Sequence, residues 1–433
     1  MKSYLNIIRK SDFFITFLVI YSIFKIFLLK DFWIKNNKSL VIFSLNSDRN
    51  IQDIEALKTF NDVKIIRFPI EVQQRITAPF LQPLRENIFK EKKWHEVKNN
   101  EDVEITKKNL IRYLEKFLSK LRRFIYFDIV MTCSFYYWHD KCWEEASPNI
   151  GIPYVVLHKE CNKDPSIFKK SIKSYLDRGF KFNGTSIIVY NNLERDCLIE
   201  SKVCGKDRIR VLGSPRMDRI QNKENKIDYK KEITLFSFRH SFGGLKIDDR
   251  KSQVAGFSYS RSEGIINYFI NVHGKFARAA IENPDKTFNI KMKWSNGWID
   301  HIYDAITKVN GVHYDKIKNL NFFGKEIDAI DLIKRSEIVI GINTTSLIEA
   351  KILGKKVVIP YFNEVKEKYD DYVFFKKYFH KNFQIAESPD QLVKLINDND
   401  FNHNGYSNQL IREYLGFNDS NSTQRVIDFL KTL

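Results

Sequence analysis

Hydrogen-bonding side chains gather at the start of one predicted helix in the C-terminal half of the chain. The segment Ser336–Phe362 (SEIVIGINTTSLIEAKILGKKVVIPYF) has the pattern of a strand, a polar turn, a helix and a second strand. Four polar residues fall where the helix begins: Asn343, Thr344, Thr345 and Ser346. Free backbone N–H groups and hydroxyls at a helix N-terminus favour an anion such as a diphosphate, and Glu349 lies one turn further on, within reach of a ribose. The alternative is that Thr344 and Ser346 only cap the helix.

A second polar segment directly follows the first predicted strand of the C-terminal half. Leu235–Gly244 (LFSFRHSFGG) places Ser237, Arg239 and His240 at the carboxyl end of that strand. An arginine there can bind phosphate through two parallel hydrogen bonds. Lys293 ends a later strand in the segment IKMKWSNGW and adds a second cation. We expect these four residues to bind a phosphorylated donor; the alternative is an ordinary polar loop.

Two segments of the N-terminal half carry further candidates. His158 and Glu160 follow a buried strand in VVLHKECNKD, where either side chain could act as general base for an acceptor hydroxyl. A buried structural histidine is the alternative. The segment GSPRMD closes this half, and we expect Ser214, Arg216 and Asp218 to lie at a hinge or cleft. The structural alternative is that Asp218 caps a helix or holds Arg216.

Composition and charge restrict the class of protein. Among 433 residues, 71 Lys and Arg oppose 53 Asp and Glu, which gives a net charge of +18 and predicts an anionic partner. The sequence has no GxxxxGK[ST], HExxH or GxSxG motif and no GxGxxG after a strand, which disfavours P-loop kinases, zincins, typical α/β-hydrolases and common dehydrogenases. No nucleic-acid-binding signature is present, so no nucleic-acid partner is expected. No DxD pair obviously follows a strand, and no metal is expected.

Short apolar runs alternate with amphipathic stretches after residue 36, which is typical of βαβ units around a parallel sheet. A charged stretch, Asp218–Lys231, separates two such series and is predicted to be a linker. We therefore predict an α/β protein with two Rossmann-like, doubly wound parallel-sheet domains, 37–222 and 223–433. The first is the expected acceptor domain and the second the expected nucleotide-donor domain, with ligands in the cleft between them. After a strand at Lys356–Tyr361, only helices are predicted.

An apolar helix is predicted within residues 1–36. Phe13–Leu29 (FFITFLVIYSIFKIFLL) is interrupted by Lys25 and has basic residues on both sides, so its charges favour no orientation across a membrane. Three alternatives remain: a helix lying in the membrane interface, a helix packed against the protein, and a true membrane span.

The stretch VIGINTTSLIEAKILGKKVVIPYF resembles the donor site of GT-B glycosyltransferases. More narrowly, it resembles that of bacterial surface-polysaccharide transferases related to capsule assembly proteins and CDP-glycerol glycerophosphotransferases. In those families a hydroxyl-rich turn receives the nucleotide diphosphate, and a carboxylate in the helix lies near the ribose. The matching positions are Thr344, Thr345, Ser346 and Glu349. GSPRMD is similar to the element that ends their first domain, whereas their usual His-Gly pair is His158-Lys159 here.

The resemblance implies a transferase that moves a sugar or a glycerol-phosphate unit from a nucleotide-activated donor to a bacterial surface polysaccharide or a lipid-linked acceptor. It implies no metal and no cofactor. The expected partners are the nucleotide-sugar donor, the glycan or lipid-linked acceptor and an anionic membrane surface, with the protein peripheral or monotopic at the cytoplasmic face of the inner membrane. Two alternatives stay open: an enzyme similar to UDP-N-acetylglucosamine 2-epimerases, and a non-catalytic basic binding protein.

Overall fold

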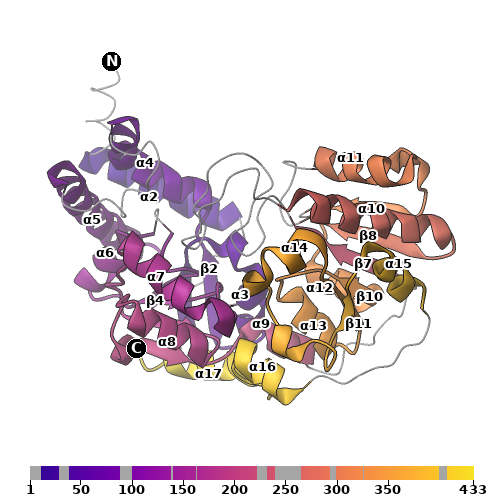
Figure 1. Ribbon diagram of the computed structural model, residues 1–433. Coiled ribbons are helices and arrows are strands. Elements are labelled where there is room, and N and C mark those ends of the chain that lie inside the picture. The colour runs from indigo at the N-terminus through magenta and orange to yellow at the C-terminus, as the bar shows by residue number, and fades with distance from the viewer. Residues whose placement is uncertain are drawn as a thin grey trace. The chain divides into compact units, whose positions relative to one another are not determined.

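The computed structural model describes residues 11–28, 39–87, 100–137, 140–161, 163–221, 232–238, 265–292, 299–324, 326–398 and 407–433. These residues form two compact units (Figure 1). Unit 1 contains the described residues of Met1–Cys161, Tyr175–Arg219 and Leu415–Leu433. Unit 2 contains those of Asn162–Ser174 and Ile220–Tyr414.

Unit 1 is built on a six-stranded parallel sheet with the order β2-β1-β3-β4-β5-β6. The strands are β1 (Leu40–Ser44), β2 (Val63–Arg67), β3 (Ile129–Thr132), β4 (Tyr154–Leu157), β5 (Ser186–Val189) and β6 (Ile209–Val211). The helices around it are α2 (Asp12–Leu28), α3 (Ile51–Leu57), α4 (Ile70–Asn87), α5 (Glu101–Arg122), α6 (Trp143–Asn149), α8 (Asn192–Glu200), α9 (Pro215–Gln221) and α17 (Ser422–Leu430). The order reverses direction between β1 and β3, which makes the carboxyl ends of these two strands the switch point where ligands of such sheets bind.

Both faces of this sheet are buried, as near-continuous apolar strands require. Alternate residues of β1, such as Leu40 and Ile42, pack against α3 and α17. Phe43 points to the other face, where its ring lies 4.8 Å from that of Phe127. Phe117 of α5 and Trp143 of α6 continue this second layer, with ring centroids 6.0 Å apart.

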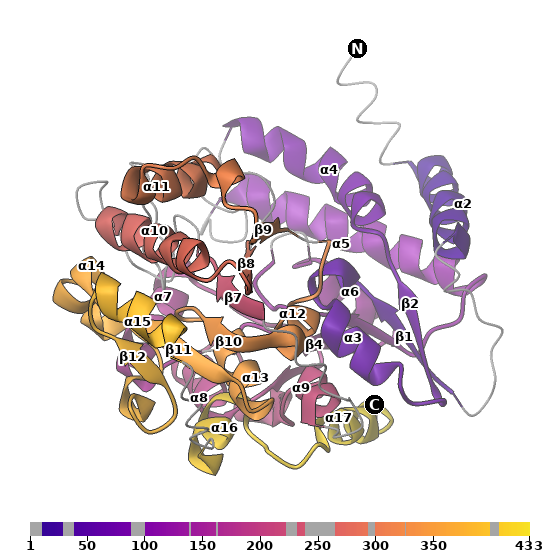
Figure 2. The same ribbon diagram turned by 90° about the vertical axis from the view of Figure 1, so that its right-hand side faces the viewer.

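The apolar N-terminal helix is α2, and it lies beside α5 and α4 (Figure 2). Its inner side chains are buried: Ile15, Leu18, Val19, Ser22 and Ile26. Among the described helices, none is both long and apolar enough to cross a membrane.

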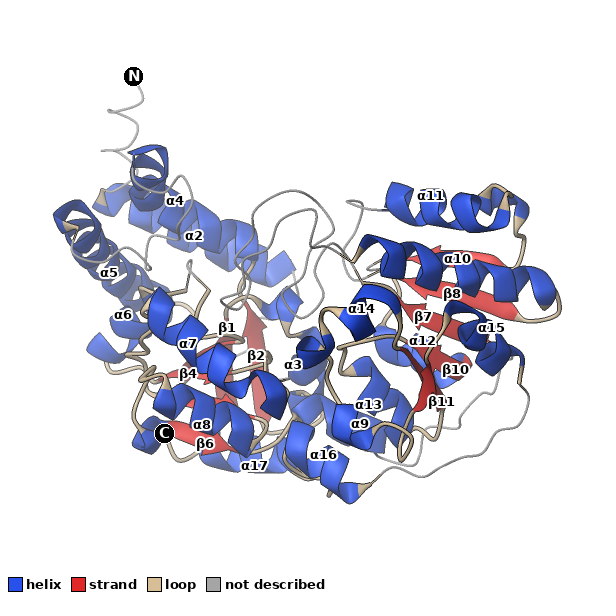
Figure 3. Ribbon diagram, in the orientation of Figure 1, coloured by secondary structure: helices blue, strands red, loops and turns tan. Residues whose placement is uncertain are grey.

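Unit 2 repeats the design with the strand order β12-β11-β10-β7-β8-β9, all parallel (Figure 2). Helices flank the strands of this sheet (Figure 3). The strands are β7 (Glu232–Phe236), β8 (Thr287–Lys291), β9 (Leu320–Phe323), β10 (Ser336–Ile340), β11 (Lys356–Pro360) and β12 (Gln384–Ala386). The helices are α10 (Ile266–Glu282), α11 (Ile299–Asn310), α12 (Ala329–Arg335), α13 (Ser346–Ile352), α14 (Asn363–Glu367), α15 (Pro389–Asn397) and α16 (Asn408–Leu415). The switch point of this sheet lies between β7 and β10.

The two Rossmann-like sheets confirm the predicted fold class. One strand was missed: β12 has three residues at the sheet edge, too few to show a periodic pattern. The predicted linker was wrong at its start, because Asp218–Gln221 belong to α9; residues 222–231 lie outside the described part.

The division into units differs from the predicted single boundary at 222/223. The segment after residue 162 groups with unit 2, since the Asp164 carboxylate accepts hydrogen bonds from Phe375 N (2.9 Å) and the Tyr414 hydroxyl. The last helix, α17, groups with unit 1 because Val426 and Ile427 fill its sheet core. Helix α7 (Phe168–Arg178) contributes residues to both units.

Candidate active site

A buried carboxylate lies at the switch point of the unit 1 sheet. Asp140 accepts hydrogen bonds from Asn46 Nδ2 (2.7 and 2.6 Å to its two oxygens), from Thr132 Oγ1 (2.7 Å) and from Gln73 Nε2. Asn46 follows β1 in a left-handed conformation (φ 53°), and Thr132 ends β3. Burial raises the pKa of Asp140 to about 6, although these hydrogen bonds act in the opposite direction. The carboxylate is therefore mostly ionised at neutral pH and holds β1, β3 and α4 together.

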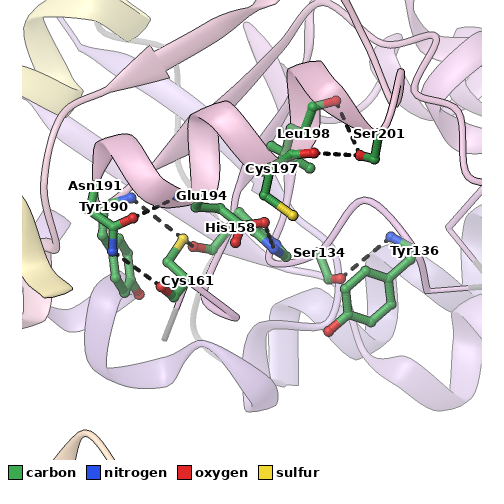
Figure 4. A network of polar contacts seen from close by, with 10 residues as sticks. All are labelled: Ser134, Tyr136, His158, Cys161, Tyr190, Asn191, Glu194, Cys197, Leu198 and Ser201. Atoms are coloured by element: carbon green, nitrogen blue, oxygen red, sulfur yellow. Dashed lines mark hydrogen bonds and ion pairs between the residues drawn. The ribbon is translucent and has the colours of Figure 1, made fainter. Parts of the chain in front are cut away.

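The two predicted catalytic residues differ in accessibility. His158 follows β4 and its ring is fully buried, 5.0 Å from the ring of Phe135, with Nε2 3.5 Å from Glu194 Oε1 of α8 (Figure 4). Glu160, two residues later, has a side chain that is 47% exposed and a carboxylate 3.8 Å from Lys159 Nζ. Of the two candidate bases, Glu160 is thus the one that a solvent-borne acceptor can reach in this conformation.

The loop after β4 is ordered by side-chain contacts to the backbone (Figure 4). Asn191 Nδ2 donates to Cys161 O (3.2 Å), while Asn191 Oδ1 accepts from Glu194 N (2.8 Å) and so caps α8. Cys161 Sγ donates to His158 O (2.9 Å). These bonds fix the position of His158 within unit 1.

The GSPRMD segment anchors other elements of unit 1. Asp218 accepts from Ser422 N (3.2 Å) and Thr423 N (2.6 Å), and therefore caps α17 rather than its own helix. Arg216 N donates to Asp53 Oδ1 (3.1 Å), and its guanidinium lies 5.8 Å from the Tyr190 ring. Ser214 is buried. Asp218 thus has the structural role that the sequence left as an alternative, with a different helix as its target.

We expect Asp218→Ala to lower the free energy of unfolding of unit 1 by about 2 kcal/mol, because two buried N–H groups lose their acceptor. Urea titration followed by circular dichroism measures the change. Asp428→Ala is the matched control: among the described residues this exposed side chain of the same helix accepts from Gln424 alone, and its loss should cost less than about 0.5 kcal/mol. Equal effects of the two variants would contradict the capping role.

The turn after β10 has the predicted position at the switch point of unit 2. Asn343 adopts a left-handed conformation (φ 50°), and its side chain is engaged with backbone: Nδ2 donates to Tyr372 O (2.7 Å) and Oδ1 accepts from Phe374 N (2.9 Å). Thr344 Oγ1 accepts from Ser346 N at 3.3 Å. Thr344 and Thr345 are half-buried, whereas Ser346 and Glu349 are buried. Asn343 therefore shapes the turn, and the two threonines are its accessible hydroxyls.

Ser237, at the end of β7, has a partner that the sequence did not suggest. Its Oγ lies 2.8 Å from His273 Nε2 of α10, and His273 Nδ1 lies 2.8 Å from Phe269 O. A carbonyl oxygen only accepts, so Nδ1 carries the ring proton and Nε2 accepts the proton of Ser237. Burial lowers the pKa of His273 to about 4, which keeps the ring neutral. Ser237 is itself buried, with 6% of its surface exposed, and its oxygen keeps acceptor capacity that suits a hydroxyl or N–H group rather than a phosphate oxygen.

A carboxylate already occupies the N-terminus of α10, the helix that follows β7. Glu364 accepts from Asn267 N (2.9 Å) and Tyr268 N (2.8 Å). An anion at this helix end is stabilised by the free N–H groups and the helix dipole. Sequence reasoning missed both His273 and Glu364, since each acts on a residue far away in the chain. The first turn of α10 is therefore already occupied by an anionic group of the protein.

Three predicted donor ligands, Arg239, His240 and Lys293, lie outside the described residues. Within the described ranges, no group of three or more His, Cys, Asp or Glu residues is arranged to hold a metal ion.

Comparison with known proteins shows likeness in structure alone. No protein-family model matches the chain, and no curated protein matches it. A solved UDP-N-acetylglucosamine 2-epimerase is 13% identical, with 91% of this chain and 95% of that chain covered and a TM-score of 0.50. The corresponding epimerase from Neisseria meningitidis, bound to UDP-GlcNAc, is also 13% identical, covering 91% and 100% with a TM-score of 0.49. A glycosyltransferase from Rickettsia africae ESF-5 is 13% identical, covering 92% and 99% with a TM-score of 0.46.

At such low identity the likeness concerns the fold. The epimerase with a TM-score of 0.50 is matched over nearly the whole of both chains, and this chain has two six-stranded parallel sheets. The chain therefore has the GT-B type of fold that its sequence predicted.

Proposed function

We propose that the protein is a GT-B-type transferase that moves a sugar or a glycerol-phosphate unit from a nucleotide-activated donor to a surface glycan or a lipid-linked acceptor. The observation that carries this proposal is the polar switch point of unit 2. Ser237 follows β7, and Thr344 and Thr345 follow the neighbouring strand β10. Hydroxyl groups at adjacent carboxyl ends of a doubly wound sheet suit a nucleotide-sugar.

We assign each residue of the two sites a proposed role. The Thr344–Ser346 turn would donate hydrogen bonds to the diphosphate, together with Arg239. Ser237 would accept from a hydroxyl of the donor. In unit 1, Glu160 or His158 would take the proton of the acceptor hydroxyl, and the accessible carboxylate of Glu160 favours the former. The charge on the leaving diphosphate would be stabilised by hydrogen bonds and cations of the protein.

The donor site is tested by nucleotide binding. Isothermal calorimetry with CMP, CDP, UDP and GDP identifies the base, and the Thr344→Ala/Thr345→Ala double variant, which removes the two accessible hydroxyls, should then weaken binding about tenfold, or about 1.4 kcal/mol. The control is Thr307→Ala on α11. This hydroxyl donates to Tyr303 O (2.9 Å) within its own helix, and the variant should bind nucleotide as the wild type does. Unchanged nucleotide affinity in the double variant would contradict the assignment.

The likeness to a UDP-N-acetylglucosamine 2-epimerase favours one alternative activity. An epimerase converts its nucleotide-sugar without an acceptor, whereas a transferase releases nucleotide in proportion to acceptor. Proton NMR of UDP-N-acetylglucosamine incubated with the protein alone distinguishes the two: a new epimer in the absence of acceptor would replace the transferase proposal.

A further inference from the structure

Helix α2 exposes a continuous apolar face. Six large side chains are between 53% and 81% exposed: Phe13, Phe17, Ile20, Phe24, Phe27 and Leu28. At 3.6 residues per turn they fall within an arc of roughly 100°. Exposed large apolar residues scattered singly are ordinary, whereas a contiguous aromatic stripe over four turns marks an interaction surface.

The opposite face of α2 is held by the protein. Ile15, Leu18, Val19 and Ile26 are buried, and Lys25 Nζ lies 3.1 Å from Glu71 Oε1 of α4. Arg75 of α4 also stacks on the ring of Tyr21, with its guanidinium 5.2 Å from the centroid. These contacts give the helix a defined inner side, so the apolar stripe is presented outward from unit 1.

A basic stripe runs along the neighbouring helix. Helix α5 lies beside α2, and Lys120 Nζ donates to Thr16 Oγ1 (3.0 Å) on the exposed side of α2. Four basic residues follow one side of α5 at spacings of four, and Arg123, directly after the helix, continues the row: Lys108, Arg112, Lys116, Lys120 and Arg123. Between Lys108 and Arg123 the only acidic residue is Glu115, which accepts from Asn149 Nδ2 (2.6 Å).

We propose that α2 and α5 form a docking surface for an anionic lipid leaflet. The aromatic stripe would enter the boundary between headgroups and acyl chains, while the α5 cations would lie against lipid phosphates. The neighbouring positive charge favours a lipid leaflet over a second copy of this chain, since two copies would bring their like-charged α5 stripes close together.

The surface ends at the carboxyl edge of the unit 1 sheet. Lys25 and Leu28 of α2 line a cavity of about 210 Å³ together with Ser47, which follows β1, and Arg67, the last residue of β2. Asp48 and Glu71 add two carboxylates to the wall. Because the opposing charges balance, the cavity suits a neutral sugar more than a bare phosphate. A glycan carried by a lipid of the bound leaflet would therefore reach this edge; this last step rests on the proposed function.

Vesicle flotation tests the surface without donor or acceptor. The wild type should float with vesicles of phosphatidylglycerol and phosphatidylethanolamine, and less with phosphatidylcholine vesicles. Phe17→Ser/Ile20→Ser/Phe24→Ser should weaken flotation about 100-fold, since three exposed apolar side chains lose their lipid contact. The matched control is Leu176→Ser/Ile281→Ser/Val312→Ser, three exposed apolar residues elsewhere, which should float as the wild type does.

Charge reversal tests the basic stripe of α5. Lys108→Glu/Arg112→Glu should weaken flotation with the anionic vesicles about tenfold or more, and Lys206→Glu/Lys308→Glu is the control with equal net charge. An unchanged melting temperature shows that each variant is folded. Failure of the wild type to float, equal loss in variant and control, or a change of oligomeric state in light scattering without any vesicle binding would overturn the proposal.

The vesicle experiments and the tests of transferase activity can fail independently of each other. If the protein transfers to a lipid-linked acceptor, the α2 variant should lose activity on acceptor embedded in vesicles and keep activity on a soluble glycan. A protein that floats but binds no nucleotide would refute the transferase and leave the docking surface standing.

Discussion

Replacing Asp140 with alanine is expected to lower the free energy of unfolding of unit 1 by about 4 kcal/mol. Three buried donors, on Asn46, Gln73 and Thr132, would lose their common acceptor. Each unsatisfied buried group costs about 1–3 kcal/mol, and relaxation or entry of water recovers part of the total. The effect is large because the carboxylate connects three elements, β1, β3 and α4, at one point. Urea denaturation at pH 7.5 followed by tryptophan fluorescence measures the change, since Trp143 packs in the same unit.

Two controls separate the hydrogen bonds from the charge. Asp140→Asn keeps one acceptor oxygen and removes the buried charge, so its effect should be smaller than that of alanine. Asp177→Ala removes an exposed carboxylate of α7 and should change stability by less than about 0.5 kcal/mol. If Asp140→Ala is no more harmful than Asp177→Ala, the network does not hold the switch point together.

Unit 2 is expected to lose up to about 3 kcal/mol of stability through His273 as the pH falls from 6.5 to 4. The folded-state pKa of this histidine is lowered to about 4 from an ordinary value of 6.5, because its ring is buried. On acidification the unfolded chain therefore binds a proton before the folded chain does. The stabilising difference is fully present above pH 6.5 and is lost as the pH approaches 4. Protonation of Nε2 would also end its role as acceptor for Ser237.

The measurement is the difference between the wild type and His273→Gln in urea titrations over this pH range. A difference is needed because Asp140 and Glu144 have pKa values raised to about 6 and about 7 by burial, and their protonation stabilises the folded state over an overlapping range. His313→Gln, at an exposed histidine of the same unit, is the control. Parallel pH profiles for the wild type and His273→Gln would show that His273 is not the acid-sensitive group.

The candidate sites were only partly predictable, because their partners are distant along the chain. The sequence predicted that Ser237 and Thr344 follow the carboxyl ends of strands, because apolar runs followed by polar residues mark that edge of a parallel sheet. The hydrogen bonds that decide what these residues can do come from elsewhere. His273 is 36 positions from Ser237, and Asn46 is 94 positions from Asp140. No local pattern connects such pairs, because they meet only when two strands or a strand and a helix become neighbours.

The amino-acid sequence by itself determined the two doubly wound sheets, because buried parallel strands and their covering helices each have a characteristic apolar period. It also determined that α2 would be an apolar helix. Which side of α2 faces outward was decided only by the tertiary structure, because apolar residues occupy most positions on both sides of that helix and periodicity cannot distinguish two apolar faces. Packing against α4 and α5 buried one side and left Phe17 and Phe24 exposed on the other. Burial in the folded chain likewise enclosed His158 and left Glu160 open to solvent, a difference that depends on neighbours brought together by folding.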